Sequence, residues 1–254
     1  MTRARHLFPA LLTTALVASG AAILVLFATL PDPAGLKDAW PESTAYMRLR
    51  SAEAEAEGRQ LRLRYSPVPI SQIPSSVQRA VRVAEDAAFF QHEGFDWHEV
   101  RQAVGEALEE GTAPRGASTI TQQLARNLYL SPNRNLLRKV REALITERLE
   151  SRLSKRRIFE LYLNVIELGI GVFGVDAGAR HYFGIPVAGV DPLQAAELAA
   201  TIPAPRSQNP ATDTRGFRWR VELVYARAFG MSDTVTEGST DVTEDAPDVI
   251  ANPE

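Results

Sequence analysis

The chain has 254 residues, a formal net charge of −3 and no cysteine. The absence of cysteine excludes a disulfide framework and a thiolate metal site. With 45% hydrophobic residues, the chain can form one medium-sized domain with its own core plus appendages. Its histidines lack the spacing of metal ligands, so no structural zinc site is predicted. They are His6, His92, His98 and His181.

An uncharged, apolar run lies near the start of the chain. Residues 7–30 contain no charged side chain in 24 positions, a length that can cross a bilayer with some tilt. Arg3 and Arg5 precede the run, so the positive-inside rule places residues 1–6 in the cytoplasm and the rest outside. A cleaved signal peptide is the alternative, but no small-x-small motif directly follows the apolar run. We therefore predict an uncleaved transmembrane helix over residues 7–30.

Charge is unevenly distributed along the chain. Residues 233–254 contain seven acids and no Lys or Arg, which predicts a disordered, solvating tail over residues 231–254. Residues 115–157 hold eleven Lys or Arg against three Glu, a local excess of +8. Such an excess favours an anionic partner such as a phosphate, a phospholipid head group or nucleic acid. A solvated helix face explains only part of it.

A connector over residues 31–65 is expected to join the membrane helix to a domain over residues 66–230. Two prolines, Pro31 and Pro33, end the membrane helix. Residues 44–60 are rich in Ala, Glu and Arg, which indicates a helix. The alternation of residues 61–65 predicts a short strand.

The first helix of the domain, predicted over residues 73–91, carries the leading catalytic candidate. Glu85 lies beside an apolar stripe at helical spacing, where a core or a ligand can partly shield it from water. A partly desolvated carboxylate has a raised pKa and can act as a general acid or base. The alternative is an acidic helix end that stops at Gly94. The stripe consists of Val77, Ala80, Val81, Ala84 and Ala88.

Two more helices follow. Asp96 is expected to cap a helix that ends near Glu110. Its apolar face consists of Trp97, Val100, Val104 and Leu108. After a loop over residues 111–117, Ser118 is expected to cap a helix that is too polar on one side for a core helix, which indicates substrate contact. These polar residues are Thr119, Gln122, Gln123 and Arg126.

A long helix is predicted over residues 136–153. Arg138, Lys139 and Glu142 are three or four residues apart, so they can meet on its surface. An ordinary exposed ion pair would have the same spacing and contribute little. The inward face is expected to consist of Leu137, Val140, Leu144 and Ile145.

The rest of the domain is expected to be helical as well. Ser154 caps one helix, and others are predicted over residues 193–201 and 215–229. A glycine-rich passage over residues 169–184 indicates close backbone packing or a cleft wall, because it matches no phosphate-loop motif. No strand-rich unit is present, so the predicted fold class is mainly α.

Four motifs occur in a fixed order along the chain. They are Glu85-Asp86-x-x-Phe89-x-x-His92-x-Gly94, then Gly116-x-Ser118-Thr119-Ile120-Thr121-Gln122-Gln123, then Arg138-Lys139-x-x-Glu142, and Lys155-x-x-Ile158-x-Glu160-x-Tyr162-Leu163-Asn164. This set resembles the peptidoglycan glycosyltransferase family, the polymerase module of class A penicillin-binding proteins and of monofunctional transglycosylases. The resemblance covers residues 66–228. Arg126 stands where the family usually has Lys, and the last family motif is only loosely matched around residues 220–227.

The resemblance implies a lysozyme-like helical glycosyltransferase domain, anchored by a single span in the cell inner membrane and facing the periplasm. The implied reaction polymerises lipid II into β-1,4 glycan with inversion and releases undecaprenyl diphosphate. By resemblance, Glu85 is the general base and Glu142 a second catalytic carboxylate. Residues implied to bind the donor and its diphosphate are Thr119, Gln122, Gln123, Arg126, Arg138 and Lys139. Residues implied to support the site are Asp86, Phe89, His92, Gly94 and Ser118.

The expected partners are lipid II, the growing glycan chain and the bilayer, together with cell-division or elongation proteins; nucleic acid is not expected. No tightly bound cofactor is implied, although Mg²⁺ or Mn²⁺ can accompany the substrate diphosphate. Two alternatives are a lysozyme-like lytic enzyme and a non-catalytic cell-wall scaffold. The +8 stretch disfavours the lytic enzyme, which has no diphosphate leaving group to neutralise. The complete set of Glu85, Arg138, Lys139 and Glu142 disfavours a scaffold.

Overall fold

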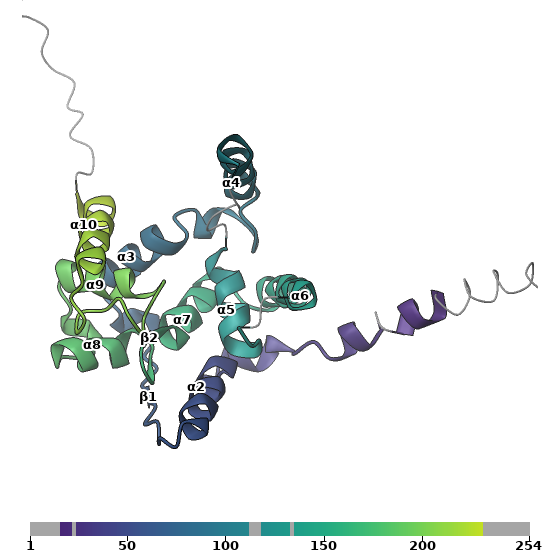
Figure 1. Cartoon of the computed structure of the whole chain (residues 1–254), viewed down its shortest axis with the longest axis horizontal. Coiled ribbons are helices and arrows are strands. Elements are labelled where there is room, and N and C mark those ends of the chain that lie inside the picture. The colour runs from purple at the N-terminus through teal and green to yellow at the C-terminus, as the bar shows by residue number, and fades with distance from the viewer. Residues whose placement is uncertain (1–15, 22–23, 112–117, 133–134, 231–254) are drawn as a thin grey trace, which may run out of the picture.

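A computed structural model describes residues 16–21, 24–111, 118–132 and 135–230 (Figure 1). It confirms the mainly α fold class. One candidate membrane span occurs in these ranges, Leu16–Lys37, by length and composition. Apolar side chains in its N-terminal part, such as Leu16, Val17 and Leu24, are exposed, and Figure 1 shows that part (purple) projecting away from the other helices. Its C-terminal part, which includes the buried Leu30, packs against the domain. Residues 1–6, the first part of the predicted span over 7–30 and the predicted acidic tail lie outside the described ranges.

The connector contains the predicted helix and strand. A 3-10 helix, η1 (Pro33–Lys37), begins where the Asp32 side chain accepts a hydrogen bond from Ala34 N. Helix α2 (Ala45–Ala56) follows, capped by the hydroxyl of Thr44, which accepts from Met47 N. The short strand β1 (Arg64–Tyr65) and the 3-10 helix η2 (Ile70–Gln72) lead into the domain.

Helix α3 (Ser75–Glu85) is shorter than the predicted helix over residues 73–91. It ends at Glu85 because Asp86 adopts φ −169° and ψ 81° and turns its carboxylate toward the start of another helix, where it accepts from Ile120 N. A separate 3-10 helix, η3 (Phe89–Gln91), follows this turn. The break places Glu85 at the C-terminal end of α3, next to a sharp change of direction.

Helix α4 (Trp97–Glu110) has the predicted cap: Asp96 Oδ1 accepts from the backbone nitrogens of His98 and Glu99. Its predicted apolar face is present in the sequence but is largely uncovered. Trp97 is 64% exposed and Leu108 80% exposed. In Figure 1, α4 stands apart from the other helices of the domain. The apolar spacing therefore predicted the helix correctly without indicating what its apolar face contacts.

The centre of the domain is formed by α5 (Ile120–Tyr129), α6 (Leu136–Arg152) and α7 (Lys155–Val165). The N-cap of α5 is Thr119 and not Ser118, which corrects the predicted cap. On α6, the predicted inward residues Leu137 and Val140 are exposed. The predicted inward residues Ile145 and Leu144 are buried and partly buried against the core, and Glu142, Thr146 and Leu149 complete the buried face.

A small sheet and three helices complete the domain. Strands β2 (Glu167–Gly169) and β3 (Val172–Phe173) pair antiparallel, and β1 pairs parallel to β3, giving the order β1-β3-β2. Helices α8 (Val175–Phe183), α9 (Pro192–Thr201) and α10 (Arg215–Phe229) follow, with the 3-10 helix η4 (Val187–Gly189) between α8 and α9. The glycine-rich passage packs closely, because a Cβ on Gly169 would lie 2.6 Å from the Tyr182 hydroxyl oxygen.

The hydrophobic core packs these helices against one another. Helix α5 packs against α6 and α7, and α3 packs against α9 and α10. Fully buried side chains from α5, α6 and α7 include Leu124, Ile145 and Leu161. Burial of each such side chain contributes roughly 1.5–3 kcal/mol. The end of α3 and the polar side of α5 are thereby held against each other by rigid helices.

Candidate active site

Glu85, the last residue of α3, is held by α5. Its Oε2 accepts a hydrogen bond from Gln123 Nε2 at 2.8 Å. Burial raises the pKa of Glu85, while the Gln123 hydrogen bond and the charges of Arg220 and Arg126 oppose that rise. The carboxylate is therefore a shielded acid whose ionised form is supported by specific neighbours. This environment matches what a general base near neutral pH requires.

The position of Gln123 is itself fixed on both sides of its amide. Its Oε1 accepts a hydrogen bond from the hydroxyl of Tyr162, on α7, at 2.9 Å. Its Nε2 also points toward the carbonyl oxygen of Ser118, 3.4 Å away. Tyr162 is completely buried. The amide thus connects the core of the domain with the Glu85 carboxylate.

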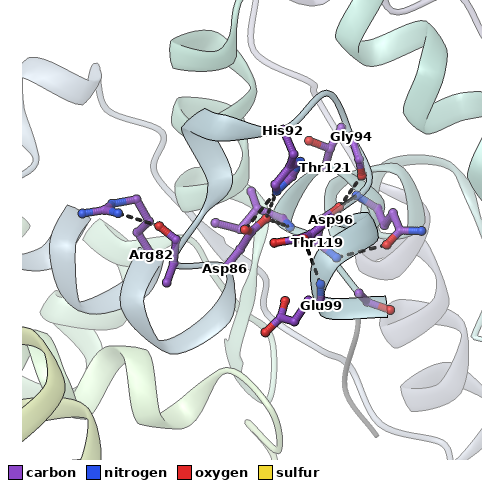
Figure 2. Close-up of polar contacts among 12 residues, drawn as sticks. Arg82, Asp86, His92, Gly94, Asp96, Glu99, Thr119 and Thr121 are labelled. Atoms are coloured by element: carbon purple, nitrogen blue, oxygen red, sulfur yellow. Dashed lines mark hydrogen bonds and ion pairs between the residues drawn. The ribbon is translucent and has the colours of Figure 1, made fainter. Parts of the chain in front are cut away.

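Asp86 ties the turn after Glu85 to the N-terminus of α5. Its carboxylate accepts from His92 Nε2 at 3.0 Å and from Ile120 N at 3.0 Å. Figure 2 shows Asp86 and His92 pointing toward each other beside the start of α5. Asp86 is 4% exposed, so these partners replace water around it. Asp86 and His92 therefore lie where they can hold the backbone of Glu85.

Gly94 and Thr119 form a second tie between the same segments. The Thr119 hydroxyl donates to the carbonyl oxygen of Gly94 at 2.7 Å (Figure 2). Gly94 has φ +85°, and a Cβ there would lie 2.9 Å from Thr146 Cγ2, so the position favours glycine for both conformation and space. The tie keeps the turn close to α5 and α6.

The side chains of Thr119 and Gln122 cap the N-terminus of α5. The Thr119 hydroxyl accepts from Gln122 N, and Gln122 Oε1 accepts from Thr119 N, which is a capping box. Both residues are at most 5% exposed. The other two polar residues predicted to contact substrate are not used in capping. Gln123 binds Glu85, and both Gln123 and Arg126 line a nearby cavity.

A second buried carboxylate lies on α6. Glu142 is 0% exposed and is paired with Arg138 Nη1 and, at 2.5 Å, with Lys139 Nζ. The three residues meet as predicted, with the Glu142 carboxylate buried and Lys139 reaching the surface. The Nε of Arg138 is buried with no hydrogen-bond partner in the described part of the chain. Because the Lys139 side chain is 47% exposed, the cluster presents positive charge to solvent.

Phe89 supports the site through packing. It is fully buried and lies against Phe159, with ring centroids 5.6 Å apart. Lys155 Nζ lies 4.3 Å from the centroid of the Phe89 ring and also donates to Glu150 at 2.8 Å. Cations over aromatic faces contribute about 0.5–2 kcal/mol. Phe89 thus anchors the segment between Asp86 and His92 to the core.

One cavity adjoins the carboxylate and a second lies nearby. Glu85 lines one of about 70 Å³ together with Arg220 and Arg227 of α10. A larger cavity of about 280 Å³ is lined in part by Gln123 and Arg126, and Pro203 borders both. The sequence did not identify Arg220 as a site residue, since the last family motif is only loosely matched there. Its position follows from the packing of α10 against α3.

The donor set does not form a metal cage. Across the described ranges, no group of three or more His, Asp or Glu side chains is arranged to hold a metal ion. Glu142, the most buried acid of the site, is already paired with two cations. Within the part of the chain that the structure describes, these side chains offer no site for a resident divalent ion.

Comparison with known proteins assigns this arrangement to a family. A family model described as Transglycosylase matches residues 54–229. A biosynthetic peptidoglycan transglycosylase of Azoarcus sp. (strain BH72) is 48% identical over 166 residues, which are 65% of this chain and 72% of that protein. Another protein of that name, from Dechloromonas aromatica (strain RCB), is 43% identical over 187 residues, covering 74% of this chain and 81% of the relative. The matched region contains every element from α3 to α10.

Proposed function

Because the chain belongs to the transglycosylase family and is a peptidoglycan glycosyltransferase, we propose that it extends β-1,4 glycan strands from lipid II at the membrane surface. In this proposal Glu85 is the general base. The observation that carries it is the environment of Glu85, a shielded carboxylate that accepts from Gln123 and lies near two arginines. The growing strand is the donor and lipid II is the acceptor.

The transfer is a single displacement at the donor's anomeric carbon. The acceptor hydroxyl oxygen forms the new bond to that carbon while its proton passes to Glu85. The bond from the anomeric carbon to the diphosphate breaks, and its electron pair leaves with undecaprenyl diphosphate. A positioned base contributes roughly 10²–10⁴-fold to such a step. One displacement at an α-linked diphosphate gives a β-glycoside, so the proposed reaction inverts configuration.

The leaving diphosphate gains negative charge as the bond breaks, so cations placed beforehand stabilise the transition state more than the ground state. Arg138 and Lys139 supply such cations on α6, and Glu142 holds both in place from the buried side. Arg126 lies on the side of α5 that faces Glu85. We propose that a divalent ion, where one takes part, arrives with the substrate diphosphate.

Membrane attachment fits this substrate. The candidate span Leu16–Lys37 would keep the domain beside a lipid-linked donor and acceptor. We propose that it is a single-pass anchor in the cell inner membrane, with its N-terminus cytoplasmic and the catalytic domain periplasmic. Cell-division or elongation proteins are the proposed partners there. The lytic alternative is disfavoured by the buried cationic cluster around Glu142, since hydrolysis of a glycan has no diphosphate to neutralise.

Product analysis tests the proposal. The detergent-solubilised protein is incubated with labelled lipid II, and the products are separated by size and examined by NMR at the new anomeric centre. We expect β-linked polymer and release of one undecaprenyl diphosphate for each bond formed. Purified cell-wall sacculi, incubated in parallel, should yield no soluble fragments. Soluble fragments from sacculi without polymer from lipid II would establish the lytic enzyme instead.

A further inference from the structure

The hydrogen bonds between Tyr162, Gln123 and Glu85 run in one direction. The phenol donates to Gln123 Oε1, and Gln123 Nε2 donates to Glu85 Oε2. We propose that Tyr162 and Gln123 are positioning residues for the transfer reaction: the buried phenol fixes the amide with its nitrogen toward Glu85, and this keeps the carboxylate ionised and aimed into the site. The inference rests on the proposed role of Glu85 as the base.

The orientation of the amide decides which protonation state of Glu85 it supports. A carboxylate only accepts hydrogen bonds, so it is stabilised by the amide nitrogen and repelled by the amide oxygen. A protonated Glu85 would instead donate, and would be stabilised by the oxygen. In the observed orientation, Nε2 faces two acceptors, Glu85 Oε2 and the carbonyl oxygen of Ser118. The network therefore favours the ionised, base-competent form.

Tyr162 makes the opposite orientation costly. Its hydroxyl is completely buried, and Gln123 Oε1 is its one acceptor in the described part of the chain. Inverting the amide would leave that hydroxyl hydrogen without an acceptor and place Gln123 Oε1 against two other oxygens. Buried donors without partners are strongly disfavoured. Burial and the charge of Glu85 also raise the pKa of Tyr162 well above its usual value, so it remains a neutral donor.

Other charged groups around Glu85 act alongside this network. Arg126 of α5 and Arg220 of α10 favour the carboxylate, whereas the neighbouring Asp86 disfavours it. Arg227 of α10 also lines the small cavity next to Glu85. Ala199 of α9 and Pro203, which follows that helix, also line that cavity and carry no charge. The Tyr162–Gln123 pair differs from these groups because it acts through directional hydrogen bonds. Gln123 donates to the carboxylate, and the buried Tyr162 donates to Gln123.

The test replaces Tyr162 with Phe and uses Tyr182→Phe as a matched control. Tyr182 is a partly buried tyrosine whose hydroxyl donates to the carbonyl oxygen of Leu168, away from Glu85. In Tyr162→Phe, the acid limb of the plot of kcat/KM against pH should move upward by about one pH unit. This is the shift expected when a charged group loses one hydrogen bond. Activity should approach that of the wild type at high pH. Tyr182→Phe should lower thermal stability without moving the acid limb.

A second readout does not depend on activity. Each full-length protein is labelled with [5-¹³C]glutamate, the Glu85 signal is assigned by its loss in Glu85→Gln, and its titration is followed by NMR. The titration should move upward in Tyr162→Phe, and coincident curves for wild type and Tyr162→Phe would overturn the inference. If Tyr162→Phe does not fold, Gln123→Met, which removes the amide, must show the upward shift, and an unmoved curve overturns it equally. Absence of polymer from the wild type would instead refute the proposed function and leave this titration interpretable.

Discussion

Arg148 of α6 donates a hydrogen bond over 2.8 Å to the backbone carbonyl oxygen of Leu30, just after the helical residues 24–28 of the candidate membrane span. Arg141, two turns earlier on the same helix, donates to the carbonyl oxygen and the hydroxyl of Thr29. The last carbonyls of a helix lack partners within the helix and carry its negative dipole end, which arginine satisfies. The helix that carries Arg138, Lys139 and Glu142 thereby also binds the segment that we propose as the membrane anchor.

From this contact we expect Arg141→Ala combined with Arg148→Ala to slow polymerisation on lipid vesicles several-fold, because the site would no longer sit at a fixed height above the bilayer. Rates with substrate and enzyme in detergent should change much less. The measurement compares both rates for the double variant and for Arg152→Ala, an exposed arginine of the same helix. Equal losses in vesicles and detergent would show that these arginines do not set the orientation.

Removing the charge of Glu142 should harm both stability and activity. Glu142→Gln leaves Arg138 and Lys139 facing each other without the buried carboxylate that balances them. Loss of one partner from a buried ion pair typically costs about 3–5 kcal/mol. Chemical denaturation should register that loss, reduced to the extent that the half-exposed Lys139 turns into solvent. A variant as stable as the wild type would mean that the cluster is held by other contacts.

Replacing Asp86 should lower stability and kcat more than replacing an ordinary helix-cap residue. Asp86→Ala removes the acceptor for both His92 and Ile120 N, so we expect a loss of about 2–3 kcal/mol and a large fall in kcat as the Glu85 turn separates from α5. Asp96→Ala removes the cap of α4, which should cost about 1 kcal/mol with little change in kcat. Thermal unfolding and steady-state rates of both variants check this difference. Similar kcat values for the two would contradict it.

The raised pKa of Glu85 gives stability a defined pH dependence. A carboxyl whose pKa is higher in the folded state binds its proton more tightly there than in the unfolded chain, so stability falls as pH rises from the unfolded pKa through the folded one. Glu85→Gln removes this term and should raise the free energy of unfolding above pH 7, by about 0.5–2 kcal/mol, as is common when a strained functional group is replaced. Below pH 4 the two proteins should unfold alike. A variant less stable than the wild type at pH 8 would contradict the direction of the shift.

The sequence predicted most helices well because their caps and apolar spacing are local signals. The α4 cap at Asp96 and the bounds of α10 follow from such signals. The C-terminal end of α3 did not, because Asp86 leaves the helix to bind Ile120 N, 34 positions along the chain. Similarly, the buried face of α6 includes a charged residue, Glu142, which an apolar pattern cannot anticipate.

The motifs predicted which residues gather near the site but not how they connect. Gln123 was expected to contact the donor, and the structure places its amide between Tyr162 and Glu85. Tyr162 lies in a matched motif, yet its hydroxyl direction depends on α7 packing against α5. Arg220 lay in the most weakly matched stretch, and only the packing of α10 on α3 brings it to the carboxylate. Connections between distant helices are tertiary facts that spacing along the chain does not contain.

The central claim is that Glu85 takes the acceptor's proton, and the most direct measurement is the rate of polymer formation from labelled lipid II by Glu85→Gln. Glu197→Gln serves as the control, since Glu197 is another acid whose pKa burial raises, on α9. We predict that Glu85→Gln is folded and slower than the wild type by roughly 10²–10⁴-fold, while Glu197→Gln polymerises at nearly the wild-type rate. A folded Glu85→Gln protein that polymerises as fast as the wild type would contradict the account.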